Sequence, residues 1–310
     1  MQLSGQLITL DRTLPLVRID GVDQRAEYAA SFSVEELKAT VGDYLDLVQS
    51  SDQDLPQIIG IKPRETLLAR RLCREHPSVG EGLIEEHFLA ANFDQVVIVE
   101  ALGKRDLDLD YLEKQLVAAY ESGGRVTVAL NKLDLFSGSS ENEVKKVQEL
   151  AEGLSVVAVS ALTGQGMPGL FELCPPQTMT VFFGRSGVGK SSLINALIGS
   201  PDLATGKTRE KDQAGRHTTV ARRIVFADER GYYDTPGVRT IGNYLHEAGL
   251  FEVFADVIEL AAQCKFRDCR HAGEPECAVL EAINSQTLST RRLNSYLSLA
   301  AEVAGDDVLT

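Results

Sequence analysis

The sequence predicts a multidomain protein with a β-rich N-terminal part, a central α/β part with a parallel sheet, and an α-helical C-terminal part. Short alternating apolar runs occur before residue 72, strand and helix patterns alternate from about residue 90, and helical apolar spacing follows residue 245. At 310 residues the chain has room for two or three domains with cores of their own. We therefore expect three domains, over residues 1–75, 76–245 and 246–310.

The N-terminal part is predicted to consist of short strands. Residues 6–10 and 16–19 alternate apolar and polar side chains, and a polar turn separates them. A third run, residues 41–45, carries a Gly-Asp turn signal. Several short strands in so short a stretch are typical of a small barrel or sandwich, although any other small β domain would give the same pattern.

The central part reads as alternating strands and helices. Residues 95–99 form a continuous apolar run, as expected for a strand that is covered on both faces. Strands that alternate with helices form a parallel sheet. Further elements of this part are expected as strands at 125–130, 155–159, 179–183 and 231–233, and as helices at 111–120 and 141–152. In the C-terminal part, helices are expected at 250–263 and 281–301.

The chain is acidic in all three parts, with a net charge of −14 and a pI near 4.9. Nonspecific nucleic-acid binding usually requires a positive surface, so this charge argues against it, although a local basic patch would be enough. No apolar run approaches 18 residues, and the N-terminus lacks the pattern of a secretory signal. We therefore expect a cytoplasmic protein that does not bind membranes.

A phosphate-binding loop is predicted where a strand runs into a helix. The pattern G-x-x-x-x-G-K-S is complete and a second serine follows it: Gly184, Arg185, Ser186, Gly187, Val188, Gly189, Lys190, Ser191 and Ser192. Glycines let backbone N–H groups turn toward phosphates without a Cβ in the way. Lys190 would contact the β- and γ-phosphates, and the Ser191 hydroxyl would bind Mg²⁺. The loop therefore indicates a nucleoside triphosphate site at the start of a helix.

The base is indicated by Asn131-Lys132-Leu133-Asp134, which follows the strand at 125–130. The Asp134 carboxylate can accept from the ring N–H and the amino group of guanine, a donor pair that adenine lacks. Lys132 can cover the base, Asn131 can connect neighbouring loops, and the N–H groups of Ser160 and Ala161 can bind the guanine carbonyl. The sequence thus predicts GTP, with a strand-ending turn in an ATPase as the alternative.

A magnesium and switch motif is predicted at Asp234-Thr235-Pro236-Gly237. Asp234 would hold Mg²⁺ through water, and the Gly237 N–H would contact the γ-phosphate. Thr218 or Thr219, which lie between the phosphate loop and Asp234, would close on Mg²⁺ in the GTP state.

The water-orienting glutamine that many GTPases carry after this glycine is replaced by Val238. His217, beside the two threonines, is the best candidate for that role, and an exposed loop histidine is the alternative. The candidate catalytic set is therefore Lys190, His217, Thr218 and Thr219.

The motifs stand in an unusual order, because the base motif precedes the phosphate loop and the switch motif. An ordinary GTPase runs from phosphate loop to switch motif to base motif. Each motif can still end its own strand of one parallel sheet. What changes is that the chain leaves the switch motif directly into the C-terminal part.

A metal site is predicted from four soft ligands in a short stretch: Cys264, Cys269, His271 and Cys277. Three thiolates and one imidazole suit tetrahedral Zn²⁺, and four protein ligands make a closed, structural site. The chain has five cysteines and no secretory signal, which favours a metal site over disulfides. Unconnected cysteines and an iron–sulfur cluster are the alternatives.

Together these motifs resemble the ribosome small subunit-dependent GTPase A family (RsgA, also called YjeQ), which combines a β-rich N-terminal domain, permuted GTPase motifs and a Cys-Cys-His-Cys tail. Seven stretches match in order, namely residues 41–43, 91–95, 131–134, 184–192, 215–219, 234–237 and 264–279. They span nearly the whole chain.

The resemblance implies an OB-fold over residues 1–75, a circularly permuted P-loop GTPase domain and a zinc-binding helical domain. It also implies Mg²⁺-dependent hydrolysis of GTP to GDP and phosphate, stimulated by the small ribosomal subunit during its late maturation. The expected partners are GTP or GDP and the small subunit with its rRNA, and the expected state is a monomer. A catalytic role for His217 carries over, because the family's Gly-Arg-His-Thr-Thr segment is intact.

A second hypothesis follows from the acidic charge. The protein would then be a GTP-switched binding module for a partner other than RNA. The densest basic run would be either a local RNA-facing patch or the solvated face of an interdomain helix, and it comprises Lys62, Arg64, Arg70, Arg71 and Arg74.

Overall fold

A computed structural model describes residues 1–11, 13–30, 38–51, 54–74, 83–103, 106–200, 222–235 and 247–304. Within these ranges no helix has the length and apolar character needed to cross a membrane.

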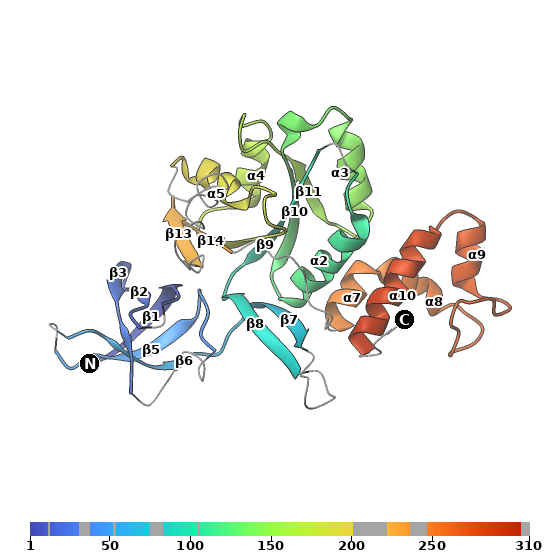
Figure 1. Cartoon of the computed structure of the whole chain (residues 1–310). Helices are drawn as coiled ribbons and strands as arrows, with labels where there is room; N and C mark the ends of the chain where they lie inside the picture. The colour runs from blue at the N-terminus through green and yellow to red at the C-terminus, as the bar shows by residue number, and fades with distance from the viewer. Residues whose placement is uncertain are drawn as a thin grey trace.

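A mixed sheet forms the centre of the molecule (Figure 1). Its central strand order is β11-β10-β9-β12-β14-β13, in which all neighbours are parallel except β13, which pairs antiparallel with β14. The bounds are β9 Gln95–Ala101, β10 Arg125–Asn131, β11 Ser155–Ala158, β12 Met179–Phe183, β13 Arg223–Ala227 and β14 Arg230–Asp234. The expected α/β arrangement is confirmed, and the antiparallel strand β13 was not predicted.

Helices cover both faces of this sheet, as the buried strand residues require. Alternate side chains of β9 enter two different cores: Val96 and Ile98 pack with α2 and α3, whereas Val97 and Val99 pack with α4 and α5. The bounds are α2 Leu109–Glu121, η1 Leu133–Leu135, α3 Ser140–Gln148, α4 Met167–Leu173 and α5 Lys190–Ile198. α3 ends before the predicted limit at residue 152.

The N-terminal strands continue the central sheet. β1 pairs with β5 and β2, and it also pairs antiparallel with β13 at Thr9 and Arg223. These strands enclose a small core of their own, which includes Leu7, Leu45 and Ile58. The bounds are β1 Gln2–Thr9, β2 Leu16–Ile19, β3 Val22–Arg25, β4 Glu27–Tyr28, β5 Tyr44–Val48 and β6 Gln57–Ile61.

Of the two alternatives for the basic run, the face of an interdomain helix is wrong. Its second half is strand β7 (Leu67–Arg74), which forms an antiparallel hairpin with β8 (Leu83–Ala91). The spacing of charges does not reveal this pairing with the next strand. Arg64 is not a free cation either, because its guanidinium donates to both carboxylate oxygens of buried Asp43 at 2.6 and 2.9 Å.

The C-terminal part is helical and lies on the α2 side of the sheet (Figure 1). Each of the two helices expected here is two helices in the structure: α7 Glu247–Val253 and α8 Ala255–Ala261, then α9 Ala278–Asn284 and α10 Thr290–Ala304. The first break falls at Phe254, whose φ of −110° and ψ of 31° are not helical. The second follows Ser285, where Gln286 takes a φ of 61°.

Candidate functional site

The phosphate loop connects β12 to α5, and its shape requires glycine. Gly184, Gly187 and Gly189 have φ values of 145°, 82° and 105°, which L-residues rarely adopt. A Cβ on Gly189 would lie 2.3 Å from Asn131 Nδ2, and one on Gly184 would lie 2.4 Å from the Val99 carbonyl oxygen. The loop therefore follows the sheet closely, and its positive-φ glycines allow the backbone shape that presents N–H groups to an anion.

Lys190, Ser191 and Asp234 meet at this loop, and all three are buried. Lys190 Nζ donates to the carbonyls of Gly184 at 2.9 Å and Arg185 at 3.0 Å. Ser191 Oγ donates to Asp234 Oδ1 at 3.0 Å. A hydroxyl and a carboxylate oxygen this close suit Mg²⁺, which takes oxygen ligands and keeps several waters. The two predicted magnesium residues are thus brought together from α5 and β14.

The base motif lies beside the phosphate loop and is bonded to it. Asn131 Nδ2 donates to the Val188 carbonyl at 2.9 Å, and Asn131 Oδ1 accepts from the Ala161 N–H at 3.2 Å. Lys132 Nζ donates to the Gly187 carbonyl at 2.7 Å. One buried asparagine thus connects the loops that follow β10, β11 and β12.

Asp134 is held by a side chain from the neighbouring loop. The Ser160 hydroxyl donates to Asp134 Oδ1, and Ser160 itself is fully buried. A carboxylate fixed in this way loses less side-chain entropy when it binds a ligand. Ser160 therefore has a side-chain role beside the backbone role expected of it.

Arg185 turns away from the loop centre toward the N-terminus of α2. Its guanidinium donates to Asp108 Oδ2 at 2.7 Å and lies 3.6 Å from the centre of the Tyr111 ring. Burial raises the pKa of Asp108, but the bonds from Arg185 and from the Tyr111 N–H outweigh it, so the pKa is lowered overall. Asp108 and Tyr111 were not predicted, although an Asp just before an apolar helical pattern is an N-cap signal.

Glu100, near the end of β9, is a further carboxyl beside the loop that was not predicted. Desolvation by burial raises its pKa, against smaller opposing effects from the Gln115 hydrogen bond and from the charges of Arg185 and Lys190.

Two predicted serines of the phosphate loop differ in burial. Ser186 is exposed on the loop, and Ser192 is half-buried in α5. His217, Thr218, Thr219 and Gly237 lie outside the described residues.

The Cys/His cluster has the geometry of a metal site. Its ligand atoms all lie within 4.8 Å of one another, in Cys264, Cys269, His271 and Cys277. His271 Nδ1 is 3.3 Å from Cys277 Sγ and 3.7 Å from Cys264 Sγ, and the two sulfurs are 3.8 Å apart. With Zn–S near 2.3 Å and Zn–N near 2.1 Å, a tetrahedral ion gives edges of roughly 3.6–3.8 Å. Cys264, His271 and Cys277 thus have about the spacing of a tetrahedral zinc site, and Cys269 Sγ lies within 4.8 Å of their ligand atoms. Other soft metals would use the same donors.

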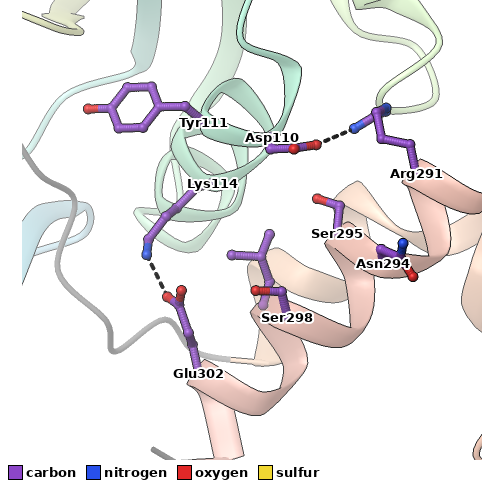
Figure 2. Close-up of a pocket in the computed structure, with 9 residues that line it drawn as sticks. Asp110, Tyr111, Lys114, Arg291, Asn294, Ser295, Ser298 and Glu302 are labelled. Atoms are coloured by element: carbon purple, nitrogen blue, oxygen red, sulfur yellow. Dashed lines mark hydrogen bonds and ion pairs between the residues drawn. The ribbon is translucent and has the colours of Figure 1, made fainter. Parts of the chain in front are cut away.

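The C-terminal helices are fixed to α2 by charged side chains (Figure 2). Lys114 pairs with Glu302 at 2.6 Å, and Arg291 pairs with Asp110 at 2.8 Å. Between these pairs lies a cavity of about 550 Å³. The helix that carries Asp108 at its N-terminus therefore also anchors α10.

Beneath these pairs Glu113 is fully buried. It accepts from Arg291, Arg292 and Ser295, and Arg292 also bonds Asp256 and the carbonyls of Leu150 and Val253.

Residues 61–244 of this chain match the sequence model of a protein family described as RsgA GTPase. A protein of Methanosarcina acetivorans named "Small ribosomal subunit biogenesis GTPase RsgA" is 32% identical over 98% of this chain and 80% of its own length. A protein of Vibrio parahaemolyticus, named "Small ribosomal subunit biogenesis GTPase RsgA 2", is 38% identical over 86% of this chain and 70% of its own length.

Solved structures show the same architecture over almost the entire chain. The crystal structure of YjeQ from Thermotoga maritima matches with a TM-score of 0.68 and 25% identity, covering 98% of this chain and 99% of its own. YloQ, described as a circularly permuted GTPase, matches with a TM-score of 0.64 and 22% identity, and the match covers 98% of this chain and 96% of YloQ. On the strength of the matched family model and of relatives above 30% identity, this chain belongs to the RsgA GTPase family.

Proposed function

We propose that this protein is a Mg²⁺-dependent GTPase that hydrolyses GTP to GDP and phosphate, is stimulated by the small ribosomal subunit and acts late in maturation of that subunit. The observation that carries the chemistry is the convergence of Asn131, Lys190, Ser191 and Asp234 near the carboxyl ends of β10, β12 and β14 in one parallel sheet. Support for the ribosomal role comes from the relatives, which are named for small-subunit biogenesis.

Each proposed role follows from the chemistry of the side chain. Lys190 would exchange its loop carbonyls for β- and γ-phosphate oxygens, and Ser191 and Asp234 would hold Mg²⁺. When bound, that ion would supply positive charge beside the transferred phosphoryl group.

Guanine is bound by Asp134, with Lys132 over the base and the backbone of Ser160 and Ala161 at its carbonyl, as the bonds among these loops support. Outside the described residues, His217 orients the attacking water, Thr218 or Thr219 closes on Mg²⁺, and the Gly237 N–H contacts the γ-phosphate.

We further propose three domains with separate tasks. Residues 1–75 form an OB-fold that contacts rRNA, residues 76–245 form the permuted GTPase domain, and residues 246–310 form a helical domain around one structural Zn²⁺. The separate small N-terminal core and the clustering of the four Cys/His ligands support this division. The protein acts as a monomer.

The test is GTP turnover at fixed protein concentration with and without purified small subunits, and with large subunits as the control. We expect stimulation by small subunits alone, and its loss in His217→Ala. Equal rates with and without small subunits would rule out the ribosomal role.

A second candidate is a GTP-switched module for a basic protein partner. It is favoured by the net charge of −14 and by the engagement of Arg64 with Asp43. Capture from lysate at physiological salt distinguishes the two: ribosomal RNA favours the first function, and a basic protein without RNA favours the second.

A further inference from the structure

Two segments that match the family in sequence have no part in the nucleotide or metal sites: residues 41–43 and residues 91–95. In the structure they meet, and the side chain that joins them is Tyr233. This tyrosine lies in β14, one residue before the magnesium carboxylate Asp234.

Tyr233 is fully buried, and its hydroxyl makes a hydrogen bond to the backbone. Its hydroxyl donates to the Ala91 carbonyl at 2.8 Å and lies 3.1 Å from the Asn92 carbonyl. Its ring packs edge-on against Phe93, with centroids 6.4 Å apart and planes at 81°. Both the polar and the apolar parts of the side chain are therefore engaged by residues 91–93.

Gly42 packs against the same residues from the N-terminal side, and the contact of residues 41–43 with residues 91–93 is called the joint below. Gly42 has a φ of +92°, and a Cβ there would lie 2.0 Å from the Ala91 carbonyl oxygen and 2.5 Å from the Tyr233 hydroxyl. The Asn92 side chain donates to the Gly42 carbonyl at 3.1 Å, and the Ala91 N–H donates to the Val41 carbonyl at 3.0 Å. Only glycine allows the backbone to come this close.

The joint is continuous with the N-terminal core. The Gly42 N–H donates to the Leu7 carbonyl, and the Leu7 N–H donates to the Asp43 carbonyl, each at 2.8 Å. Buried Asp43 is in turn held by Arg64. A displacement of the N-terminal strands would therefore displace the groups that hold Tyr233.

The other strand of the β13–β14 hairpin is held by the same region. β13 pairs with β1 at Thr9 and Arg223, and the Arg18 guanidinium lies 3.6 Å from the centre of the Phe226 ring. The hairpin that carries Asp234 thus contacts the N-terminal strands along both of its strands.

We propose that Tyr233 is a positioning residue: its hydroxyl, held by the joint of residues 41–43 and 91–93, fixes the end of β14 and so places Asp234 for Mg²⁺. The N-terminal strands thereby contribute to the magnesium site without touching it. The inference rests on the proposed GTPase function only in that Mg²⁺ accompanies the nucleotide.

Tyr232 provides a matched control on the same strand. It is equally buried, but it points to the opposite face, and its hydroxyl has no hydrogen-bond partner among the described residues. Tyr233→Phe and Tyr232→Phe each remove one buried hydroxyl and keep the ring, so only the first removes a hydrogen bond.

The experiment measures release of a fluorescent GDP analogue from the full chain as a function of Mg²⁺ concentration. A net hydrogen bond is worth about 1 kcal/mol, which corresponds to about five-fold if all of it acted on Mg²⁺ binding. We expect the half-saturating Mg²⁺ concentration to rise about three-fold in Tyr233→Phe and to stay at the wild-type value in Tyr232→Phe. Release rates in EDTA should agree among the three proteins.

Equal Mg²⁺ requirements in Tyr233→Phe and wild type would overturn the inference, as would an equal rise in both variants. Neither result depends on the ribosome. A Mg²⁺ shift in a protein that small subunits do not stimulate would support the inference and reject the proposed ribosomal function.

Discussion

Removing the Glu113 side chain should loosen the C-terminal helices from the GTPase sheet. In Glu113→Ala the Arg292 guanidinium, whose side chain is only 6% exposed, loses its closest carboxylate and cannot reach water. Breaking a buried pair on one side costs about 3–5 kcal/mol. Arg292 keeps Asp256 and two carbonyls, so the lower half of that range, about 3 kcal/mol, is expected.

Urea unfolding followed by circular dichroism measures this cost. With a urea dependence of about 3 kcal/mol per molar, the midpoint should fall by about 1 M. Lys146→Ala is the control, because it breaks a pair whose lysine is 53% exposed, and exposed pairs contribute little to stability. A Glu113→Ala midpoint no lower than that of the control would refute the inference that Glu113 holds the C-terminal helices against α2.

Three further outcomes are expected. Asp134→Asn should weaken GTP binding about 10- to 100-fold in equilibrium titration, because hydrogen bonds to a charged group contribute about 1.5–3 kcal/mol; unchanged GTP preference would support the ATPase alternative. Glu100→Gln should stabilise the protein increasingly as pH rises. The raised folded pKa makes wild type lose stability from the ordinary carboxyl pKa upward, so melting temperatures should agree near pH 4 and separate by pH 8. A parallel pair of curves would contradict this explanation. Mass spectrometry under native conditions should find one zinc ion per chain and none in Cys269→Ser, and a strong chelator should lower the helical signal of wild type alone.

Local patterns predicted the elements whose partners lie nearby or whose faces are both buried. The strands at 16–19 and 179–183 have the predicted bounds, and Asn131, Ser191 and Asp234 come together as the motifs required. The order of those motifs also predicted the permuted connection of the sheet. In each case the information is carried by a few consecutive residues.

The remaining features depend on contacts between elements that no pattern of a few consecutive residues encodes. The β7–β8 hairpin is stabilised by pairing across the intervening residues 75–82, and charge spacing gave no sign of it. The Arg185–Asp108 pair joins residues 77 positions apart. The break at Phe254 places its ring in the core against Tyr296 of α10, with ring centroids 5.6 Å apart, so tertiary packing overrides a continuous helical pattern.

The pairing of β1 with β13 has a practical consequence for work with shortened forms of this protein. Without residues 1–75, β13 would lose its one residue pair with β1, at Arg223, and the Arg18 guanidinium over Phe226, and it would end the sheet as an open edge with the apolar residues Ile224 and Val225 on its two faces. Exposed edges of this kind recruit strands from other molecules. The isolated GTPase part should therefore aggregate in proportion to its concentration, and placing a lysine or proline on this edge strand is the first remedy to attempt.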